Sequence, residues 1–205
     1  NSLGYNNSDW KNSIISQLNN FQHLSNIFTN NSTVSLAKKL CELSGMSKVF
    51  FANSGAEANE CAIKLARKYS FNKYGEGRGT ILSLKQSFHG RTLATLTATG
   101  QDKFHNYFFP FPTGFNYATA NSIDDLQEKL TSDVCAIIME AIQGEGGVHQ
   151  LNKDFVLATC KLAKEKDILI IFDEVQCGIA RTGNLFGYNT FNVEPDIVTC
   201  AKGLG

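Results

Sequence analysis

Short runs of consecutive apolar residues recur along the chain. The clearest of them predict β-strands over residues 49–51, 80–84, 134–139, 168–172 and 196–200. Within each run the apolar residues follow one another instead of alternating with polar ones, so both faces of each strand are expected to be covered. This pattern favours a mostly parallel sheet with crossover helices.

Between these runs, the spacing of apolar residues predicts amphipathic helices. The longest is expected over residues 56–69, with one apolar face made of Ala58, Ala62, Leu65, Ala66 and Tyr69. Two others are expected over residues 123–130, opened by Ser122, and over residues 155–166. Strands that alternate with helices predict an α/β fold in three layers, α/β/α.

The first 35 residues differ from the rest, because they are rich in Asn and Ser and carry scattered aromatic residues such as Trp10, Phe21 and Phe28. They are expected to form a lead-in segment packed on a main domain of residues 36–205. The last predicted strand is followed by only a few residues, up to Gly205. The chain is therefore interpreted as a fragment: its main domain is expected to be incomplete, and a C-terminal domain is expected to be absent from this chain.

Charge and composition exclude several classes of function. Lys+Arg and Asp+Glu both number 19, so the net charge of +0 argues against a nucleic-acid or anionic-membrane partner. No apolar run approaches the roughly 18 residues of a membrane span. The six cysteines form no Cys-x-x-Cys pair and the four histidines are scattered, so no metal site is expected. Free thiols within apolar segments are typical of a reducing, cytoplasmic setting.

Two strand ends carry residues of complementary chemistry. Asp173 closes the apolar run 168–172, and Lys202 follows the run 196–200. Enzymes can hold pyridoxal 5'-phosphate with a lysine and a carboxylate that follow two strands. The lysine amine condenses with the cofactor aldehyde, and the aspartate keeps the pyridine nitrogen protonated. Both are therefore predicted to be catalytic.

A phosphate site is predicted where the longest helix begins. Ser54 and Glu57 have capping-box spacing, while Gly55 and Ala56 have almost no side chain to keep an anion from their N–H groups. A phosphate also suits the positive end of the helix dipole. An ordinary capped helix is the alternative interpretation of this segment.

Two loops after predicted strands add candidate ligand contacts. Phe88 is expected to lie flat on the pyridine ring, and Arg91 offers a planar fork for a substrate carboxylate. His89 is interpreted as structural. In the second loop Glu145 stands among glycines at the carboxyl edge of the sheet and is a candidate partner for a substrate or an arginine.

The residues after Asp173 complete the predicted cofactor site. Val175 is expected against the ring face opposite Phe88, and Gln176 near the phenolic oxygen of the cofactor. Glu174 is included among the cofactor-binding residues, with a scaffold role.

Six segments in this order resemble the class III (ω-amino acid) aminotransferases of fold type I, along nearly the whole chain. They are residues 53–60, 88–92, 143–147, 172–176, 178–183 and 201–203. The stretch from Arg91 to Phe104 is most similar to acetylornithine aminotransferases. The resemblance implies a homodimer with a shared active site, and a C-terminal domain that supplies a substrate-binding arginine with which Glu145 interacts.

The resemblance further implies transfer of the terminal amine of N-acetylornithine, or a related ω-amino acid, to 2-oxoglutarate. Ornithine, succinylornithine or 4-aminobutyrate aminotransferases and a mutase or racemase on the same scaffold are the alternatives. A non-catalytic binding scaffold and a nucleotide-binding domain are two further ones. The second is disfavoured because no Gly-x-Gly-x-x-Gly turn opens a helix.

Overall fold

The computed structural model describes residues 2–25 and 27–204, so Gly205, the last residue of the expected main domain, lies outside the described residues. The chain separates into two compact units, Asn1–Phe50 and Phe51–Gly205. The boundary expected from composition, at residue 35, falls inside helix α2 (Asn31–Ser44).

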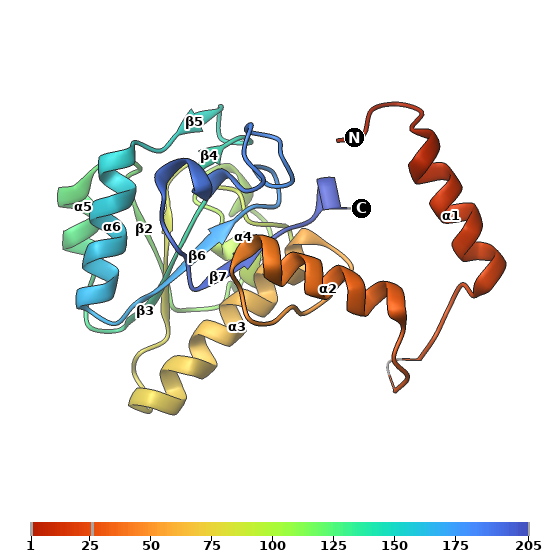
Figure 1. Ribbon diagram of the computed structural model, residues 1–205. Coiled ribbons are helices and arrows are strands. Elements are labelled where there is room, and N and C mark those ends of the chain that lie inside the picture. The colour runs from red at the N-terminus through yellow and green to blue at the C-terminus, as the bar shows by residue number, and fades with distance from the viewer. Residues whose placement is uncertain (1, 26, 205) are drawn as a thin grey trace. The chain divides into compact units, whose positions relative to one another are not determined.

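The second unit is built on a parallel five-stranded sheet (Figure 1). Its order is β2-β1-β3-β6-β7, from β2 (Phe115–Ala118) and β1 (Thr80–Leu84) through β3 (Val134–Met139) and β6 (Leu169–Asp173) to β7 (Ile197–Thr199). Every neighbouring pair of strands is parallel. The carboxyl ends of β3, β6 and β7 therefore meet at one edge of the sheet.

Helices cover both faces of this sheet. Successive side chains of a strand point to opposite faces, so neighbouring residues of one strand belong to different apolar cores. Leu82, Ile137 and Phe172 share one apolar core with residues of α5 (Ile123–Lys129) and α6 (Lys153–Glu165). Ile81, Ile138 and Ile171, each one residue away, pack in a second core with α3 (Gly55–Tyr74) and α4 (Leu93–Ala98). The predicted three-layer α/β fold is confirmed.

Short elements fill the connections of the second unit. Strands β4 (Ile142–Gln143) and β5 (His149–Gln150) form a small antiparallel pair. Three 3₁₀ turns are η1 (Asp102–Phe104), η2 (Gly187–Phe191) and η3 (Lys202–Leu204). The last of these carries Lys202.

The first unit consists of two helices, each begun by an asparagine. Asn7 caps α1 (Ser8–Asn20) by accepting a hydrogen bond from the N–H of Trp10 at 2.8 Å, and Asn30 caps α2 in the same way. Gly45 ends α2 in the left-handed conformation, with φ 77. Helix α1 buries none of its residues, so packing within this unit contributes little to its stability.

The predicted strands 80–84 and 134–139 agree with the structure, and the last two each differ by one residue at both ends. The strand expected over residues 49–51 is wrong: these residues pair with no strand in the described part of the chain. An apolar run becomes a strand only where a neighbouring backbone takes up its hydrogen bonds. The elements that were not predicted include α2, α4 and β2, the short pair β4 and β5, and the three 3₁₀ turns.

The face predicted for the long helix is partly wrong. Leu65 and Tyr69 are exposed, whereas Asn59 and Ser70 lie on the buried face with Ala62 and Ala66. The helix is thus rotated so that a polar residue, Asn59, faces the sheet.

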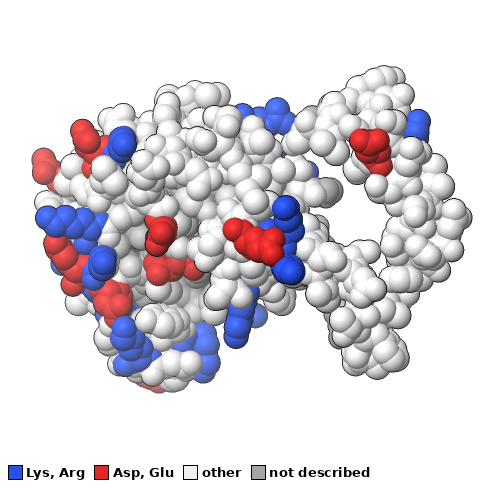
Figure 2. Space-filling model, viewed as in Figure 1, with Lys and Arg blue, Asp and Glu red and all other residues white. Residues whose placement is uncertain are grey.

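Acidic and basic side chains are interspersed over the side of the second unit formed by α5 and α6 (Figure 2). Ion pairs join Lys129 to Glu128 and Lys161 to Glu165 on these helices, at 2.9 and 3.9 Å. Within the described residues, no helix combines the length and apolarity needed to cross a membrane.

Candidate active site

The carboxyl ends of β6 and β7 bring Asp173 and Lys202 to the same edge of the sheet. Asp173 and Thr199 are register partners on the two strands, and the N–H of Glu174 donates to the carbonyl of Thr199 at 2.7 Å. Lys202 follows three residues later, exposed and with φ 47. The two residues expected to be catalytic therefore share one edge.

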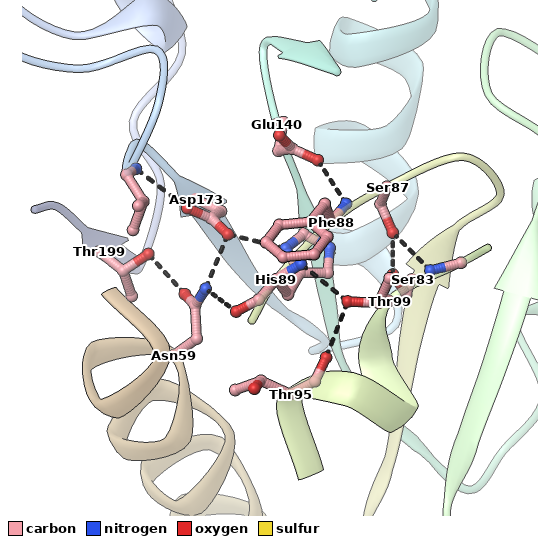
Figure 3. A network of polar contacts seen from close by, with 12 residues as sticks. Asn59, Ser83, Ser87, Phe88, His89, Thr95, Thr99, Glu140, Asp173 and Thr199 are labelled. Atoms are coloured by element: carbon pink, nitrogen blue, oxygen red, sulfur yellow. Dashed lines mark hydrogen bonds and ion pairs between the residues drawn. The ribbon is translucent and has the colours of Figure 1, made fainter. Parts of the chain in front are cut away.

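The carboxylate of Asp173 is 2% exposed and accepts three hydrogen bonds (Figure 3). Oδ2 accepts from Asn59 Nδ2 at 2.7 Å and from His89 Nδ1 at 2.8 Å, and Oδ1 accepts from the N–H of Val175 at 3.0 Å. Among the described residues, no Lys or Arg forms an ion pair with it. A buried carboxylate held by such donors is suited to a cationic group that comes from outside the chain.

His89 has a defined orientation. A carboxylate only accepts, so Nδ1 must carry the proton that it shares with Asp173. The other ring nitrogen, Nε2, is buried and has no hydrogen-bond partner among the described residues. The sequence assigned His89 a structural role and did not reveal its direct contact with Asp173.

Glu140 follows β3 and positions the residue expected to stack on the cofactor. Its Oε1 accepts from the N–H of Phe88 at 2.9 Å, and the side chain is buried. Burial raises the pKa of Glu140 well above its usual value, and the charge of Asp173 raises it further. The Phe88 hydrogen bond and the charge of Lys202 act in the opposite direction on this pKa.

Helix α3 begins with free donors. Ser54 Oγ accepts from the N–H of Glu57 at 3.2 Å, as its spacing predicted. The reciprocal half of the expected capping box differs, because Glu57 accepts from the N–H of Asn53 at 2.7 Å and not from Ser54. No hydrogen bond between described residues uses the N–H of Gly55 or Ala56. These two groups can take an anion.

Two glycines, Gly55 and Gly144, allow their segments to lie close to the residues that follow Asp173. A Cβ on Gly55 would stand 2.6 Å from a methyl of Val175, so any side chain there would push the start of α3 away from the strand end. A Cβ on Gly144 would overlap the side-chain oxygen of Gln176. The start of α3 and the Gly144 loop are thus each held against the segment that follows Asp173.

Arg91 and Glu145 lie on the exposed side of the site. The guanidinium of Arg91 stands 5.2 Å from the centre of the Phe88 ring, and Arg91 has no ion pair among the described residues. Glu145 accepts from Gln101 Nε2 at 2.5 Å and forms an ion pair with Lys103 at 3.5 Å. The structure therefore leaves Arg91 available to a carboxylate but gives Glu145 partners that the sequence did not suggest.

Glu174 binds the backbone of turn η2 next to the site. Its two oxygens accept from the N–H groups of Gly187 and Tyr188, at 2.7 and 2.9 Å. Burial raises the pKa of this carboxyl to about 7, although the two hydrogen bonds favour the charged form. Glu174 thus holds turn η2 against the end of β6.

Three functional candidates were missed by the sequence argument: Asn59, Glu140 and Thr199. Asn59 did leave a signal. It stands three, four and seven residues before Ala62, Ile63 and Ala66, on the apolar face of a helix, where an amide is unusual. Glu140 and Thr199 are ordinary strand-end residues, and only the folded arrangement reveals their contacts.

Comparisons with known proteins agree with this geometry. The family model described as Aminotransferase class-III matches residues 1–205. An acetylornithine aminotransferase of Haemophilus ducreyi is 53% identical over 100% of this chain and 52% of its own length, and one of Caldanaerobacter subterraneus is 52% identical with the same coverage. The chain therefore belongs to the class-III aminotransferases, as its motifs indicated.

Solved structures show the same fold. An ω-transaminase from Thermomicrobium roseum has a TM-score of 0.93 at 32% identity and covers 98% of this chain and 51% of its own. An ornithine aminotransferase from Toxoplasma gondii has a TM-score of 0.92 at 29% identity over 97% and 48%. A second structure of that enzyme holds partly occupied pyridoxal phosphate in its active site. The chain spans about half the length of the curated relatives that it matches.

Glu174 predicts a pH dependence of stability. From about pH 4.5, the usual pKa of a glutamate, to about pH 7, the unfolded carboxyl is ionised while the buried one keeps its proton. The native state then binds more protons, so this contribution to stability is complete below about pH 4.5 and is lost as the pH rises through 7. Urea midpoints of the intact protein should fall over this range more than those of Glu174→Gln, which does not titrate. Parallel curves for the two proteins would contradict the assignment.

Proposed function

We propose that the intact protein is a pyridoxal-phosphate-dependent aminotransferase that moves the terminal amine of N-acetylornithine to 2-oxoglutarate. The observation that carries this proposal is the buried carboxylate of Asp173, held by three donors at the sheet edge from which Lys202 also projects. Full-chain identity of 53% to an acetylornithine aminotransferase supports the choice of amine donor.

The residues of this chain fit the cofactor at three points. The free N–H groups of Gly55 and Ala56, with Ser54 beside them, would hold the phosphate. Asp173 would face the ring nitrogen, and Lys202 would bind the aldehyde carbon. Gly55 permits the close approach of α3 to Val175, which would bring the phosphate and the ring nitrogen within reach of one ligand.

The remaining cofactor contacts are proposed from the same neighbourhood. Phe88 and Val175 would lie on the two faces of the ring, and Gln176 would reach the phenolic oxygen. Glu174 is assigned the task of holding turn η2, since both of its oxygens are already bonded.

When bound, pyridoxal phosphate withdraws electrons from the substrate carbon that bears the amine. Asp173, held by three hydrogen-bond donors, would face the ring nitrogen and favour its protonated form. Once the substrate amine has displaced it, Lys202 Nζ would take the proton from the substrate carbon as a base and deliver it to the cofactor carbon C4′ as an acid. Glu140 and Phe88 keep one wall of the site in place through the 2.9 Å hydrogen bond between them.

Arg91 is proposed to bind the α-carboxylate of the amine donor, since its guanidinium has no ion pair among the described residues and offers parallel donors. Glu145 would interact with an arginine outside this chain. The proposal also includes a cytoplasmic homodimer with a shared active site.

One alternative donor has specific support. A succinylornithine transaminase of Photorhabdus laumondii is 44% identical over the whole chain, and a Buchnera aphidicola relative, 51% identical, is named for both acetylornithine and succinyldiaminopimelate. All three donors carry an N-acylated α-amine beside a carboxylate, and a free amine at the far end. Rates with each donor on the intact protein decide among them.

Lys202→Ala should abolish both turnover and the covalent bond between protein and cofactor. Borohydride fixes such a bond, and mass spectrometry of the digested intact protein then locates it. The wild type should carry the cofactor on the peptide containing Lys202, whereas Lys161→Ala, which alters an exposed lysine on α6, should behave like the wild type. A label on another lysine would place the attachment elsewhere.

Arg91→Lys tests the substrate class. Lysine cannot reproduce two parallel hydrogen bonds to a carboxylate. The KM for acetylornithine should rise, with about 1.5–3 kcal/mol lost for a charged hydrogen bond. Simple ω-amines without an α-carboxylate should be affected far less. An equal loss of kcat/KM with both kinds of donor would make Arg91 structural.

A further inference from the structure

Asn59 occupies an unusual position for an amide. It lies in the second turn of α3, 1% exposed, on the face that packs against the sheet. A helix gains nothing from asparagine at such a site, because alanine has a better intrinsic propensity and no polar group to desolvate. The side chain must therefore be explained by its partners.

These partners determine which way the amide points. Oδ1 accepts from the hydroxyl of Thr199 at 2.7 Å, while Nδ2 donates to the carbonyl of His89 and to Asp173 Oδ2, both at 2.7 Å (Figure 3). A flipped amide would set its oxygen against a carbonyl and a carboxylate, two groups that cannot donate. Thr199 and His89 thus leave Asn59 one orientation, with an N–H aimed at Asp173.

The network joins the three elements that make the proposed cofactor site. Asn59 belongs to the helix whose start would hold the phosphate, Asp173 ends β6, and Thr199 ends the strand that leads to Lys202. Among the described residues, Asp173 Oδ2 accepts from Asn59 and His89, and Oδ1 accepts only from the N–H of Val175. The second lone pair of Oδ1 is left for a ligand.

We propose that Asn59, held by Thr199, is a positioning residue that keeps Asp173 anionic and oriented so that the proton stays on the cofactor ring nitrogen. The inference rests on the proposed function. Each donor to a carboxylate lowers its affinity for a proton. Without the Asn59 N–H, Asp173 becomes more basic, the shared proton moves from the ring nitrogen to the carboxylate, and the ring withdraws electrons less effectively.

A structural role alone makes a different prediction. A buried asparagine that only ties α3 to β7 would lower the melting temperature when replaced, and it would leave the protonation of the ring nitrogen unchanged. The readout must therefore report that proton directly. The ¹⁵N chemical shift of ¹⁵N-labelled pyridoxal phosphate in the intact protein does so, because it differs between the protonated and the neutral ring.

The experiment compares Asn59→Ala and a matched pair at Thr199. Thr199→Val removes the hydroxyl with little change of shape and leaves Asn59 Oδ1 without its donor, whereas Thr199→Ser keeps a hydroxyl. Asn59→Ala should move the ¹⁵N shift toward the neutral ring and lower kcat by about tenfold to a hundredfold, the range for one hydrogen bond to a charged group, with KM for the amine donor little changed. Thr199→Val should act in the same direction but less strongly, and Thr199→Ser should restore most of the signal.

Thr159→Val serves as the control for removing a buried threonine hydroxyl. Its hydroxyl bonds the carbonyl of Phe155 at 2.7 Å within α6, on the other face of the sheet. This variant should change stability only. If Asn59→Ala does not fold, the Thr199 pair carries the test. Wild-type ¹⁵N shifts in Asn59→Ala or in Thr199→Val would overturn the inference, whereas a wild type without amine transfer would overturn the proposed function itself.

Discussion

The burial of the Asp173 carboxylate is the constraint on which this site depends. A charge that is 2% exposed is costly unless donors surround it, and here they come from three segments: Asn59 in α3, His89 after β1 and the backbone of Val175. These donors join the end of β6 to α3 and to the loop after β1, and Asn59 in turn accepts from Thr199 at the end of β7. The buried anion thus connects the elements of the proposed cofactor site.

Continuous apolar runs allowed β1 and β3 to be predicted from the sequence within their observed bounds. Strand β2 was not predicted, because Phe115–Ala118 is partly exposed and mixes polar with apolar residues, so it contains no continuous apolar run. Residues 49–51 form the opposite case, an apolar run without a paired neighbour in the described chain. Strand formation depends on a partner that local pattern does not reveal.

The site was predictable to the level of strand ends and helix starts, because parallel strands bring their carboxyl ends to one edge. That rule indicated Asp173 and Lys202 as neighbours, while the small residues at the start of the long helix indicated a phosphate site at Gly55. It could not indicate that Asn59 and Thr199 hydrogen-bond across 140 positions of sequence, or that Glu140 holds the backbone of Phe88. The Asn59 contact depends on how α3 is rotated against the sheet, and the apolar spacing of α3 suggested a different face. The Glu140 contact joins two loops whose course the sequence pattern does not determine.

The most direct test of the central claim is a single-turnover measurement on Asp173→Asn in the intact protein. Asparagine has nearly the same shape as aspartate but cannot keep a proton on the ring nitrogen. The account predicts that the variant still binds pyridoxal phosphate, while proton removal from the amine donor slows by several orders of magnitude. A rate close to that of the wild type would remove Asp173 from the chemistry and contradict the account.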